Sequence, residues 1–444
     1  MTSATSISVT PKAVVFFARD FLAQEFPKIG LLFGDYRRVY VTANDVEAKL
    51  IGQIDTDSEI CEIAEGPVTS DARRRTGEYG FNDDRVLRLL GCDQLKSIVN
   101  PVEALCAYLT TKYDIRYYFD EPVSGFANFA FNRAFTEAGA VCLHFQSSWV
   151  PGFMFFTSDQ AQRRPVAFHL AHDNPDRVKQ HVVARRDGLA RPLYVLNYGS
   201  VRKRLVDIGG TAAKIVYRNL FRRKALYIDR DVQAHRFHLQ SLIWSFLGRY
   251  SRDPVANGNT GVRYVVFPLH YEPEAVLNYF SDFQRQEEIA AQILDSMPLG
   301  YELILKEHPS QPGALHSPKW ASLRKAKRVI LLRGDYDSRR LFSLRPITVS
   351  IASTFALEAA VAGCPVGVLG GVHFLDMPGI TALNGPREWT KLIDAAPSNI
   401  EAIIQWYERF LATYCFSGNF MRGQTVLPQL SEMVQILIKA DQSR

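Results

Sequence analysis

Cysteine is scarce and scattered in this chain of 444 residues, and no two cysteines form a C-x-x-C pair. The six cysteines stand at positions 61, 92, 106, 142, 364 and 415. This spacing is not typical of a disulfide framework or of a structural zinc site. Reduced thiols in a cytoplasm fit it best, and we expect no bound metal.

Long apolar runs are also absent. No stretch approaches the roughly 20 residues that a helix needs to cross a bilayer. The first residues, Met1-Thr-Ser-Ala-Thr-Ser, lack the basic and then apolar layout of a secretory signal. We therefore expect a cytoplasmic protein.

Glutamate is missing from one long segment, residues 161–253. This segment holds 19 Lys and Arg against seven Asp, a local net charge of +12, while the whole chain carries +6. Such a concentration of positive charge favours an anionic partner, although solvated helix faces would explain it equally well. No zinc-knuckle, KH or RRM signature accompanies it, so nucleic acid is the least favoured partner.

The composition indicates a folded protein of more than one domain. Hydrophobic residues make up 47% and charged residues 22% of the chain, and 444 residues are too many for one ordinary core. A turn-rich stretch at 253–261 suggests the boundary. We predict an N-terminal α/β domain at 1–255 that includes the basic helical segment 161–253. A C-terminal Rossmann-like domain at 256–396 and helices at 397–444 follow.

Strand and helix patterns alternate between residues 263 and 371, and polar residues stand where strands should end. One apolar run leads to His270 and Glu274, and the next leads to Lys306 and His308. In a parallel α/β sheet the carboxyl ends of the strands line the ligand crevice. We therefore expect these side chains on one rim of the sheet. There the carboxylates of Glu272 and Glu274 could hold ribose hydroxyls or a base edge.

Several residues on this rim suit a phosphate. His308-Pro309 follows a strand that also carries Lys306, which offers a hydrogen bond and a positive charge. Ser353 and Thr354 precede a helical run, so hydroxyls and free backbone N–H groups meet at a helix start. Glu358 lies about one turn further on. Each feature alone is commonly an ordinary turn or cap, and their combination favours an anion site.

The N-terminal half holds another strand–helix–strand unit. A strand at 116–122 ends in Asp120 and Glu121, Ser124 could cap a helix at 126–139, and a strand at 140–145 follows. Carboxylates at a strand end can serve as a base or a nucleophile. Asp35, at a transition between strand and loop, is a second candidate.

Three motifs resemble the capsule polysaccharide biosynthesis family. They are Phe267-Pro-Leu-His-Tyr-Glu-Pro-Glu274, Met297-Pro-Leu-Gly-Tyr-Glu-Leu-Ile-Leu-Lys-Glu-His-Pro309 and Ser353-Thr-Phe-Ala-Leu-Glu-Ala-Ala-Val-Ala-Gly-Cys-Pro365. Family members usually have Gln-Pro-Glu where this chain has Glu272-Pro-Glu274, and Gly-Thr where it has Ser353-Thr354. The first difference adds a negative charge beside the expected donor site. In the N-terminal half the resemblance is limited to the region around Asp120.

The resemblance implies a GT-B glycosyltransferase, in which two Rossmann-like domains face a central cleft and C-terminal helices pack back on the N-terminal domain. Known members transfer Kdo, a 3-deoxy-octulosonic acid, from CMP-Kdo to surface polysaccharides such as capsule or lipopolysaccharide. They are retaining enzymes with an aspartate nucleophile in the N-terminal domain. This implies a CMP-activated acidic sugar as donor, a glycan or lipid-linked acceptor and no metal or other cofactor; Asp335-Tyr-Asp337 does not lie on the loop that a metal-binding Asp-x-Asp motif would occupy.

Carried over by motif, the donor-binding residues are His270, Glu274, Lys306, His308, Pro309, Ser353, Thr354 and Glu358. Asp120 and Glu121 are the catalytic candidates by approximate position. The basic segment would then suit peripheral attachment to the anionic inner face of the cytoplasmic membrane. Two alternatives remain open, namely a glycerophosphotransferase that uses CDP-glycerol and a non-catalytic scaffold of an export or assembly complex.

Overall fold

A computed structural model of the chain describes residues 10–63, 92–121, 125–170, 176–187, 201–221, 229–251, 253–257, 261–272, 281–283 and 285–443. Its contacts divide the chain into two compact units, each discontinuous in sequence. Unit 1 comprises 1–172, 224–226 and 411–444, and unit 2 comprises 173–223 and 227–410. These borders differ from the predicted ones, because most of the basic segment 161–253 falls in unit 2.

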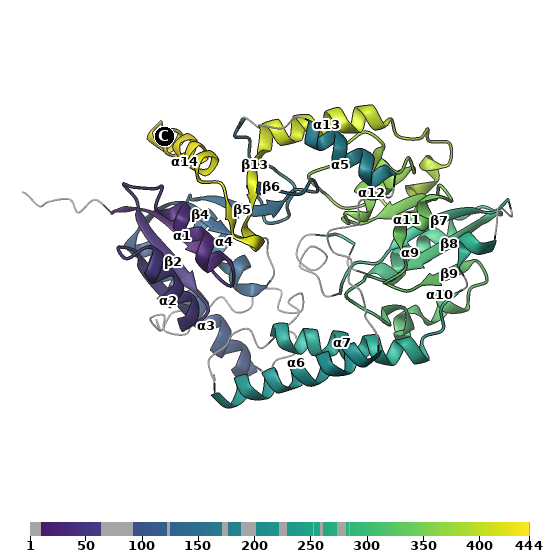
Figure 1. Ribbon diagram of the computed structural model, residues 1–444, viewed down its shortest axis with the longest axis horizontal. Helices are drawn as coiled ribbons and strands as arrows, with labels where there is room; N and C mark the ends of the chain where they lie inside the picture. Colours follow the sequence, from purple (N-terminus) through teal and green to yellow (C-terminus); the bar gives the residue numbers. More distant parts are fainter. Residues whose placement is uncertain are drawn as a thin grey trace, which may run out of the picture. The chain divides into compact units, whose positions relative to one another are not determined.

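Unit 1 is built on a sheet of eight strands (Figure 1). The strands are β1 (Lys12–Phe17), β2 (Arg37–Thr42), β3 (Glu59–Glu62), β4 (Asp114–Asp120), β5 (Val141–Ser147), β6 (Phe153–Thr157), β13 (Cys415–Asn419) and β14 (Gln424–Thr425). They lie in the order β14-β13-β6-β5-β4-β1-β2-β3. The run from β3 to β5 is parallel, whereas the pairs beyond β5 are antiparallel.

Helices cover both faces of this sheet. They are α1 (Leu22–Gly30), α2 (Asp45–Ile54), α3 (Cys92–Lys112), α4 (Phe126–Glu137) and α14 (Leu427–Gln442), with the short 3-10 helix η8 at Phe420–Arg422. Side chains of β1 alternate between two cores: Val14 and Phe16 pack with α1 and α14, whereas Val15 and Phe17 pack with α3 and α4. The period of two in a strand explains this division.

Unit 2 contains a sheet of six parallel strands. They are β7 (Arg263–Pro268), β8 (Tyr301–Lys306), β9 (Val329–Leu332), β10 (Ile347–Ser350), β11 (Val366–Val368) and β12 (Ile380–Ala382). The order β12-β11-β10-β7-β8-β9 places the first strand in the middle, with two more on one side and three on the other. This is the strand order of a Rossmann fold.

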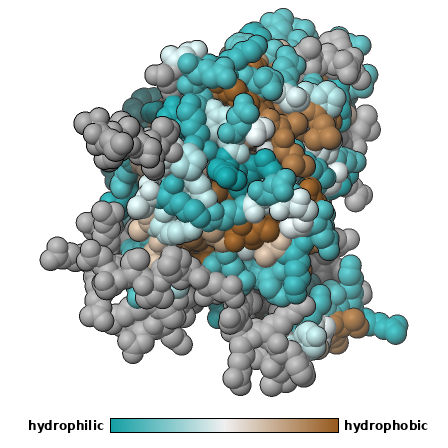
Figure 2. Space-filling view, turned by 90° about the vertical axis from the view of Figure 1, so that its left-hand side faces the viewer, coloured by the Kyte–Doolittle hydropathy of each residue, from teal (hydrophilic) through white to brown (hydrophobic). Residues whose placement is uncertain are grey.

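Unit 2 also contains most of the remaining helices. They are α5 (Asp176–Arg186), α6 (Val201–Phe221), α7 (Asp229–Leu247), α9 (Gln286–Asp295), α10 (Ala321–Lys325), α11 (Ser338–Phe342), α12 (Phe355–Val361) and α13 (Ile400–Tyr414), which leads into β13. Short 3-10 helices lie at η4 (Pro254–Asn257), η5 (Ala314–His316), η6 (Pro318–Trp320) and η7 (Pro386–Leu392). On the face drawn in Figure 2, most of the residues coloured by hydropathy are hydrophilic, and the hydrophobic ones form smaller patches.

The predicted fold class is confirmed in that the chain is α/β with two Rossmann-like domains, one around each of these sheets. The central cleft of a GT-B arrangement stays a prediction. The predicted packing of C-terminal helices on the N-terminal part holds for α14, whose apolar face joins the core of unit 1. Gly139 follows the end of α4 with a φ of 89°, as expected for a helix-ending glycine. The proposed cap Ser124 lies outside the described residues.

A buried carboxylate ties α14 to the sheet. Asp441 accepts hydrogen bonds from Lys12 Nζ at 2.8 Å, Tyr36 Oη at 2.7 Å and Arg116 Nε at 2.5 Å. Although burial opposes its ionisation, these three partners together lower the pKa of Asp441 to about 2. Because the folded pKa is below the ordinary value, the carboxylate stabilises the fold at neutral pH.

We predict that Asp441→Asn lowers the free energy of unfolding at pH 7 by about 2 kcal/mol, the equivalent of its pKa shift. The stabilisation is lost as pH falls from the ordinary pKa towards the folded one, so the difference should shrink by about half at pH 3. Urea denaturation at several pH values measures it. Asp114→Asn is the matched control, since Asp114 lies 3.6 Å from Arg116 but is half-exposed. A difference independent of pH would contradict this account.

Candidate functional site

The chain changes direction across the unit 2 sheet at its centre. From β7 it adds strands towards one edge of the sheet, and from β10 it adds strands towards the other. β7 and β10 are neighbours there, and the chain leaves β7 towards β8 but leaves β10 towards β11. Open α/β sheets bind ligands beyond the carboxyl ends of the strands at such a switch point. His270 follows β7 and lies at this point, where its Nε2 accepts a hydrogen bond of 3.1 Å from the backbone N–H of Ala352 after β10.

Gln286, the first residue of α9, holds the backbone of His270. Its Oε1 accepts from the His270 N–H at 2.7 Å, and its Nε2 donates to the His270 carbonyl at 3.2 Å. The same amide nitrogen lies 2.6 Å from Glu272 Oε1. Both His270 and Gln286 are buried, and His270 is held at its backbone by Gln286 and at its ring by the Ala352 N–H.

Glu272 stands where members of the capsule polysaccharide family usually have Gln, so it adds a negative charge. Its carboxylate forms an ion pair with Lys319, and its backbone is held by the Gln311 side chain at 2.9 Å on both the N–H and the carbonyl. The added charge is therefore paired with a lysine, which Glu287 also approaches at 3.3 Å. Glu274, predicted to bind the donor, lies outside the described residues.

Lys306 ends β8 and is buried. Its Nζ donates to the Gly334 carbonyl at 2.9 Å, beyond the end of β9. Burial lowers the pKa of Lys306 to about 8, although nearby carboxylates, Asp335 and Glu358 foremost, favour the charged form. A buried ammonium whose proton is held weakly thus lies at the carboxyl edge of the sheet.

His308 is half-buried two residues beyond β8, in front of Pro309. Its Nδ1 accepts a hydrogen bond of 3.1 Å from the Ser310 N–H. Because Nδ1 is an acceptor, the neutral ring carries its proton on Nε2. His308 can therefore donate a hydrogen bond through Nε2–H, as binding to a phosphate oxygen requires.

Ser353 and Thr354 lie at the start of α12. Ser353 Oγ accepts from the Phe355 N–H at 3.2 Å, which is the local contact of a cap. Thr354 makes no cap hydrogen bond and is exposed. The structure thus places both at the rim where the sequence predicts them, next to the residue that His270 contacts.

Glu358, in the first turn of α12, forms an ion pair with Arg185 of α5. The distance from Nη2 to Oε1 is 2.6 Å, and both side chains are largely buried. Burial raises the pKa of the Glu358 carboxyl, whereas Arg185 and Lys306 oppose this rise. The sequence analysis missed Arg185, whose only signal was its place in the basic segment.

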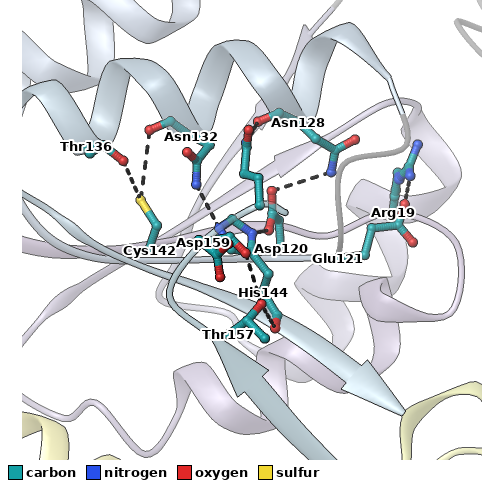
Figure 3. Close-up of polar contacts among 11 residues, drawn as sticks. Arg19, Asp120, Glu121, Asn128, Asn132, Thr136, Cys142, His144, Thr157 and Asp159 are labelled. Carbon is teal, nitrogen blue, oxygen red and sulfur yellow. Dashed lines mark hydrogen bonds and ion pairs between the residues drawn. The ribbon is translucent and has the colours of Figure 1, made fainter. Parts of the chain in front are cut away.

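Unit 1 has an equivalent switch point between β1 and β4. Arg19, two residues beyond β1, forms an ion pair with Glu121, which follows β4 (Figure 3). Glu121 is partly exposed at this edge. Asp35 lies two residues before the start of β2. It is therefore at the opposite, amino-terminal edge of the parallel strands. The structure does not place it with Asp120 and Glu121.

Asp120 lies in a buried hydrogen-bonded chain. Its Oδ1 is bound by Nδ1 of His144 on β5, and its Oδ2 has a longer contact of 3.5 Å with Asn128 of α4 (Figure 3). On the far side of the ring, Asn132 Nδ2 lies 2.8 Å from His144 Nε2. An amide nitrogen can only donate, so Nε2 accepts and Nδ1–H donates to Asp120.

Asp120 and His144 have no exposed surface. His144 and Asn132 were not recognised from the sequence, because a lone histidine in an apolar strand and an asparagine in a helix give no signal by themselves. Their pairing depends on the parallel alignment of β4 with β5, which sets Asp120 opposite His144.

The described part of the chain lacks two kinds of feature. No group of three or more His, Cys, Asp or Glu side chains there is arranged to hold a metal ion. None of the helices in the described ranges is long and apolar enough to cross a membrane.

Residues 237–420 match the family described as capsule polysaccharide biosynthesis protein. The match begins within α7 and spans every strand of the unit 2 sheet. The resemblance predicted from three motifs is confirmed for this segment. No protein of curated function matches the sequence.

Solved structures resemble the chain only distantly. KpsC of Thermosulfurimonas dismutans, a beta Kdo 2,7 transferase, is 12% identical with a TM-score of 0.38, covering 90% of this chain and 99% of that one. The beta Kdo 2,4 transferase KpsC of the same organism is 11% identical with a TM-score of 0.35, covering 72% and 88%. Anabaena Alr3699/HepE, solved with UDP and glucose, is 12% identical with a TM-score of 0.30, covering 96% and 99%. Likeness at this level assigns no donor, acceptor or mechanism.

The buried pair of Arg185 and Glu358 gives a prediction. Arg185→Met should lower the free energy of unfolding by about 3 kcal/mol, because it leaves a buried carboxylate without its cation. Adding Glu358→Gln should restore most of this loss, so that the two changes couple by about 2 kcal/mol. Urea denaturation of the two single variants and the double variant measures the coupling. Strictly additive losses would contradict the pairing.

Proposed function

We propose that this protein is a glycosyltransferase of bacterial surface-polysaccharide synthesis that transfers Kdo from CMP-Kdo to a glycan or lipid-linked acceptor. The observation that carries the proposal is the match of residues 237–420 to the capsule polysaccharide family. That segment contains the whole Rossmann-like sheet and the switch point at His270. A nucleotide-sugar donor is the class of ligand that such a crevice accepts.

The donor phosphate is assigned to His308 and the start of α12. A CMP-sugar has one phosphate, and breaking the bond to the sugar leaves CMP as a phosphomonoester. The Nε2–H of His308 can donate to a phosphate oxygen, and the hydroxyl of Thr354 can do the same. Lys306 adds positive charge at the same edge of the sheet. Groups that stabilise the charge developing on the leaving group lower the barrier, and the scheme needs no metal ion.

The nucleophile is assigned to Asp120. Its carboxylate would bond to the anomeric carbon of Kdo while the bond from that carbon to the CMP oxygen breaks. The acceptor hydroxyl would then displace Asp120 from the anomeric carbon and pass its proton to water, which frees the carboxylate and gives net retention. The hydrogen bond from His144 leaves Oδ2 of Asp120 as the less firmly held oxygen. Asp120 has no exposed surface in the described structure, so its attack requires a local rearrangement that opens the carboxylate to the donor. Glu121 is the alternative carboxylate, because it is partly exposed at the same strand end.

A nucleotide titration tests the donor class. We expect CMP to raise the melting temperature more than CDP, UDP or ADP, because a ligand that binds only the folded state stabilises it by about 2.7 kcal/mol at 100 times its Kd. His308→Ala should weaken CMP binding about tenfold to a hundredfold, the value of a hydrogen bond to a charged group. Thermal-shift titration gives both results.

His308→Gln is the matched control, because its amide nitrogen can stand near the position of Nε2 and should keep much of the affinity. A preference for CDP would favour the glycerophosphotransferase that uses CDP-glycerol. An absence of any response to nucleotides would overturn the transferase proposal and favour a scaffold.

A transfer assay tests the nucleophile. Asp120→Asn should lower kcat about a thousandfold with CMP binding close to that of the wild type, while its melting temperature, measured alongside, reports the separate cost of changing a buried carboxylate. The comparison is Glu121→Gln: a loss confined to this variant would move the role to Glu121. Phosphate in the product would instead indicate glycerophosphate transfer.

We further propose that the enzyme works at the inner face of the cytoplasmic membrane. Lipid-linked acceptors with phosphate or acidic sugars lie there, and the basic segment 161–253 would be attracted to the same anionic surface. The segment falls mostly within unit 2, which also holds the donor-binding candidates.

A further inference from the structure

Helices α6 and α7 form a hairpin in which several polar side chains lie between the two helices. Arg204 of α6 is buried and donates to the Ser241 carbonyl of α7 at 2.8 Å. Thr211 lies 3.0 Å from His235 Nδ1, and Asp207 lies 3.8 Å from His238 Nδ1. A surface helix usually buries its apolar side and exposes its polar side. This hairpin does the reverse.

The outward faces of both helices are apolar. The exposed hydrophobic side chains are Leu205, Val206, Val216 and Tyr217 on α6, and Leu239, Ile243, Phe246 and Leu247 on α7, with exposures of 38% to 70%. We call these eight residues the hairpin stripe. On α7, Ile243 is four residues from Leu239, three from Phe246 and four from Leu247. On α6, Leu205 and Val216 are eleven residues apart, as are Val206 and Tyr217, which is about three helical turns. Each set therefore lies on one side of its helix.

The α6 half of the stripe is flat between its apolar ends. Gly209, Gly210 and Ala213 fall on the same helical face as Val206 and Val216 by their spacing, and all three are exposed. No atom lies within 4 Å of where a Cβ would stand on either glycine. This face is therefore open in the described structure.

Positive charge borders the stripe. Arg202, Lys203 and Lys214 of α6 and Arg236 of α7 are exposed, and among the described side chains of the hairpin no acidic one is exposed. The only acidic residue with a described side chain, Asp207, faces His238 between the helices. Apolar side chains with a basic border are the features of a helix that lies in the interface of an anionic bilayer.

The hairpin is fixed to the rest of unit 2 at its C-terminal end. The Trp244 ring stacks on His316 with centroids 4.7 Å apart. Gly313 lies beneath the same indole, so close that a Cβ there would overlap it, and its φ is 84°. Binding through the stripe would therefore position the Rossmann-like sheet of unit 2 as well.

We propose that the hairpin stripe docks on an anionic lipid bilayer, with its aliphatic and aromatic side chains among the acyl chains and its basic border at the headgroups. A second copy of the chain is the less suitable occupant, because pairing two stripes would bring basic borders of the same sign together. The inference rests on the proposed function only for the membrane location, and no step of the chemistry enters it.

The test is co-sedimentation with vesicles of equal parts phosphatidylglycerol and phosphatidylcholine, compared with vesicles of phosphatidylcholine alone. We expect the full-length wild type to bind the anionic vesicles. The stripe variant, Val206→Gln with Val216→Gln, Phe246→Gln and Leu247→Gln, should bind at least about tenfold more weakly, because the buried apolar area drives insertion. Replacing Lys203, Lys214 and Arg236 by Gln should weaken binding about fivefold for each charge at low salt.

Leu299→Gln is the matched control, because Leu299 is 93% exposed on unit 2 but lies outside the hairpin. It should bind vesicles as the wild type does, and all variants should keep the wild-type melting temperature since only exposed side chains change. Three results would overturn the proposal: no binding by the wild type, equal binding by the stripe variant, or a lipid-free dimer that the stripe variant abolishes in sedimentation velocity. The assay uses no nucleotide, so its failure and a failure of the CMP titration are separate results.

Discussion

The hydrogen bond from the Ala352 N–H to His270 joins the two strands of unit 2 whose connections turn in opposite directions. The sheet begins in its middle, and right-handed crossovers then carry the chain first to one side and later to the other. Connections that diverge in this way leave a crevice at the carboxyl ends of the two central strands, here β7 and β10. His270, Lys306, His308 and Ser353 stand at that edge because each follows or ends a parallel strand. Arg19 and Glu121 face one another at the same position of the other sheet.

Much of this arrangement could be predicted from the sequence, because it depends on residues that are close together along the chain. Apolar runs with polar ends identified β7, β8 and the start of α12, and they therefore identified His308 and Ser353 as residues at the carboxyl edge of the sheet. The helix around residues 126–139 and its terminal glycine followed from periodicity and from the freedom of glycine at positive φ. The three motifs also indicated the family that residues 237–420 match.

The contacts that could not be predicted join residues that are far apart along the chain. Arg185 precedes Glu358 by 173 residues, and nothing in either neighbourhood indicates the other. His144 and Asn132 become partners of Asp120 only through the register of β4 with β5 and the packing of α4. The hairpin is a different case: its sequence shows helices with apolar and basic residues, but only the structure shows which side of each helix is packed. The assignment of 161–253 to the N-terminal domain followed chain order, whereas the contacts place most of it in unit 2.

The division of unit 1 has a consequence for the order in which the protein can fold. Its sheet receives β13 and β14, and its core receives α14, from the final part of the chain, after the whole of unit 2 has been synthesised. Until then β6 presents an unpaired edge, and Tyr36 and Arg116 lack the carboxylate of Asp441. On a ribosome, unit 2 can therefore complete its sheet first. Unit 1, although it begins the sequence, can close only after β13, β14 and α14 have been synthesised, and during that interval the open edge of β6 can pair with other strands.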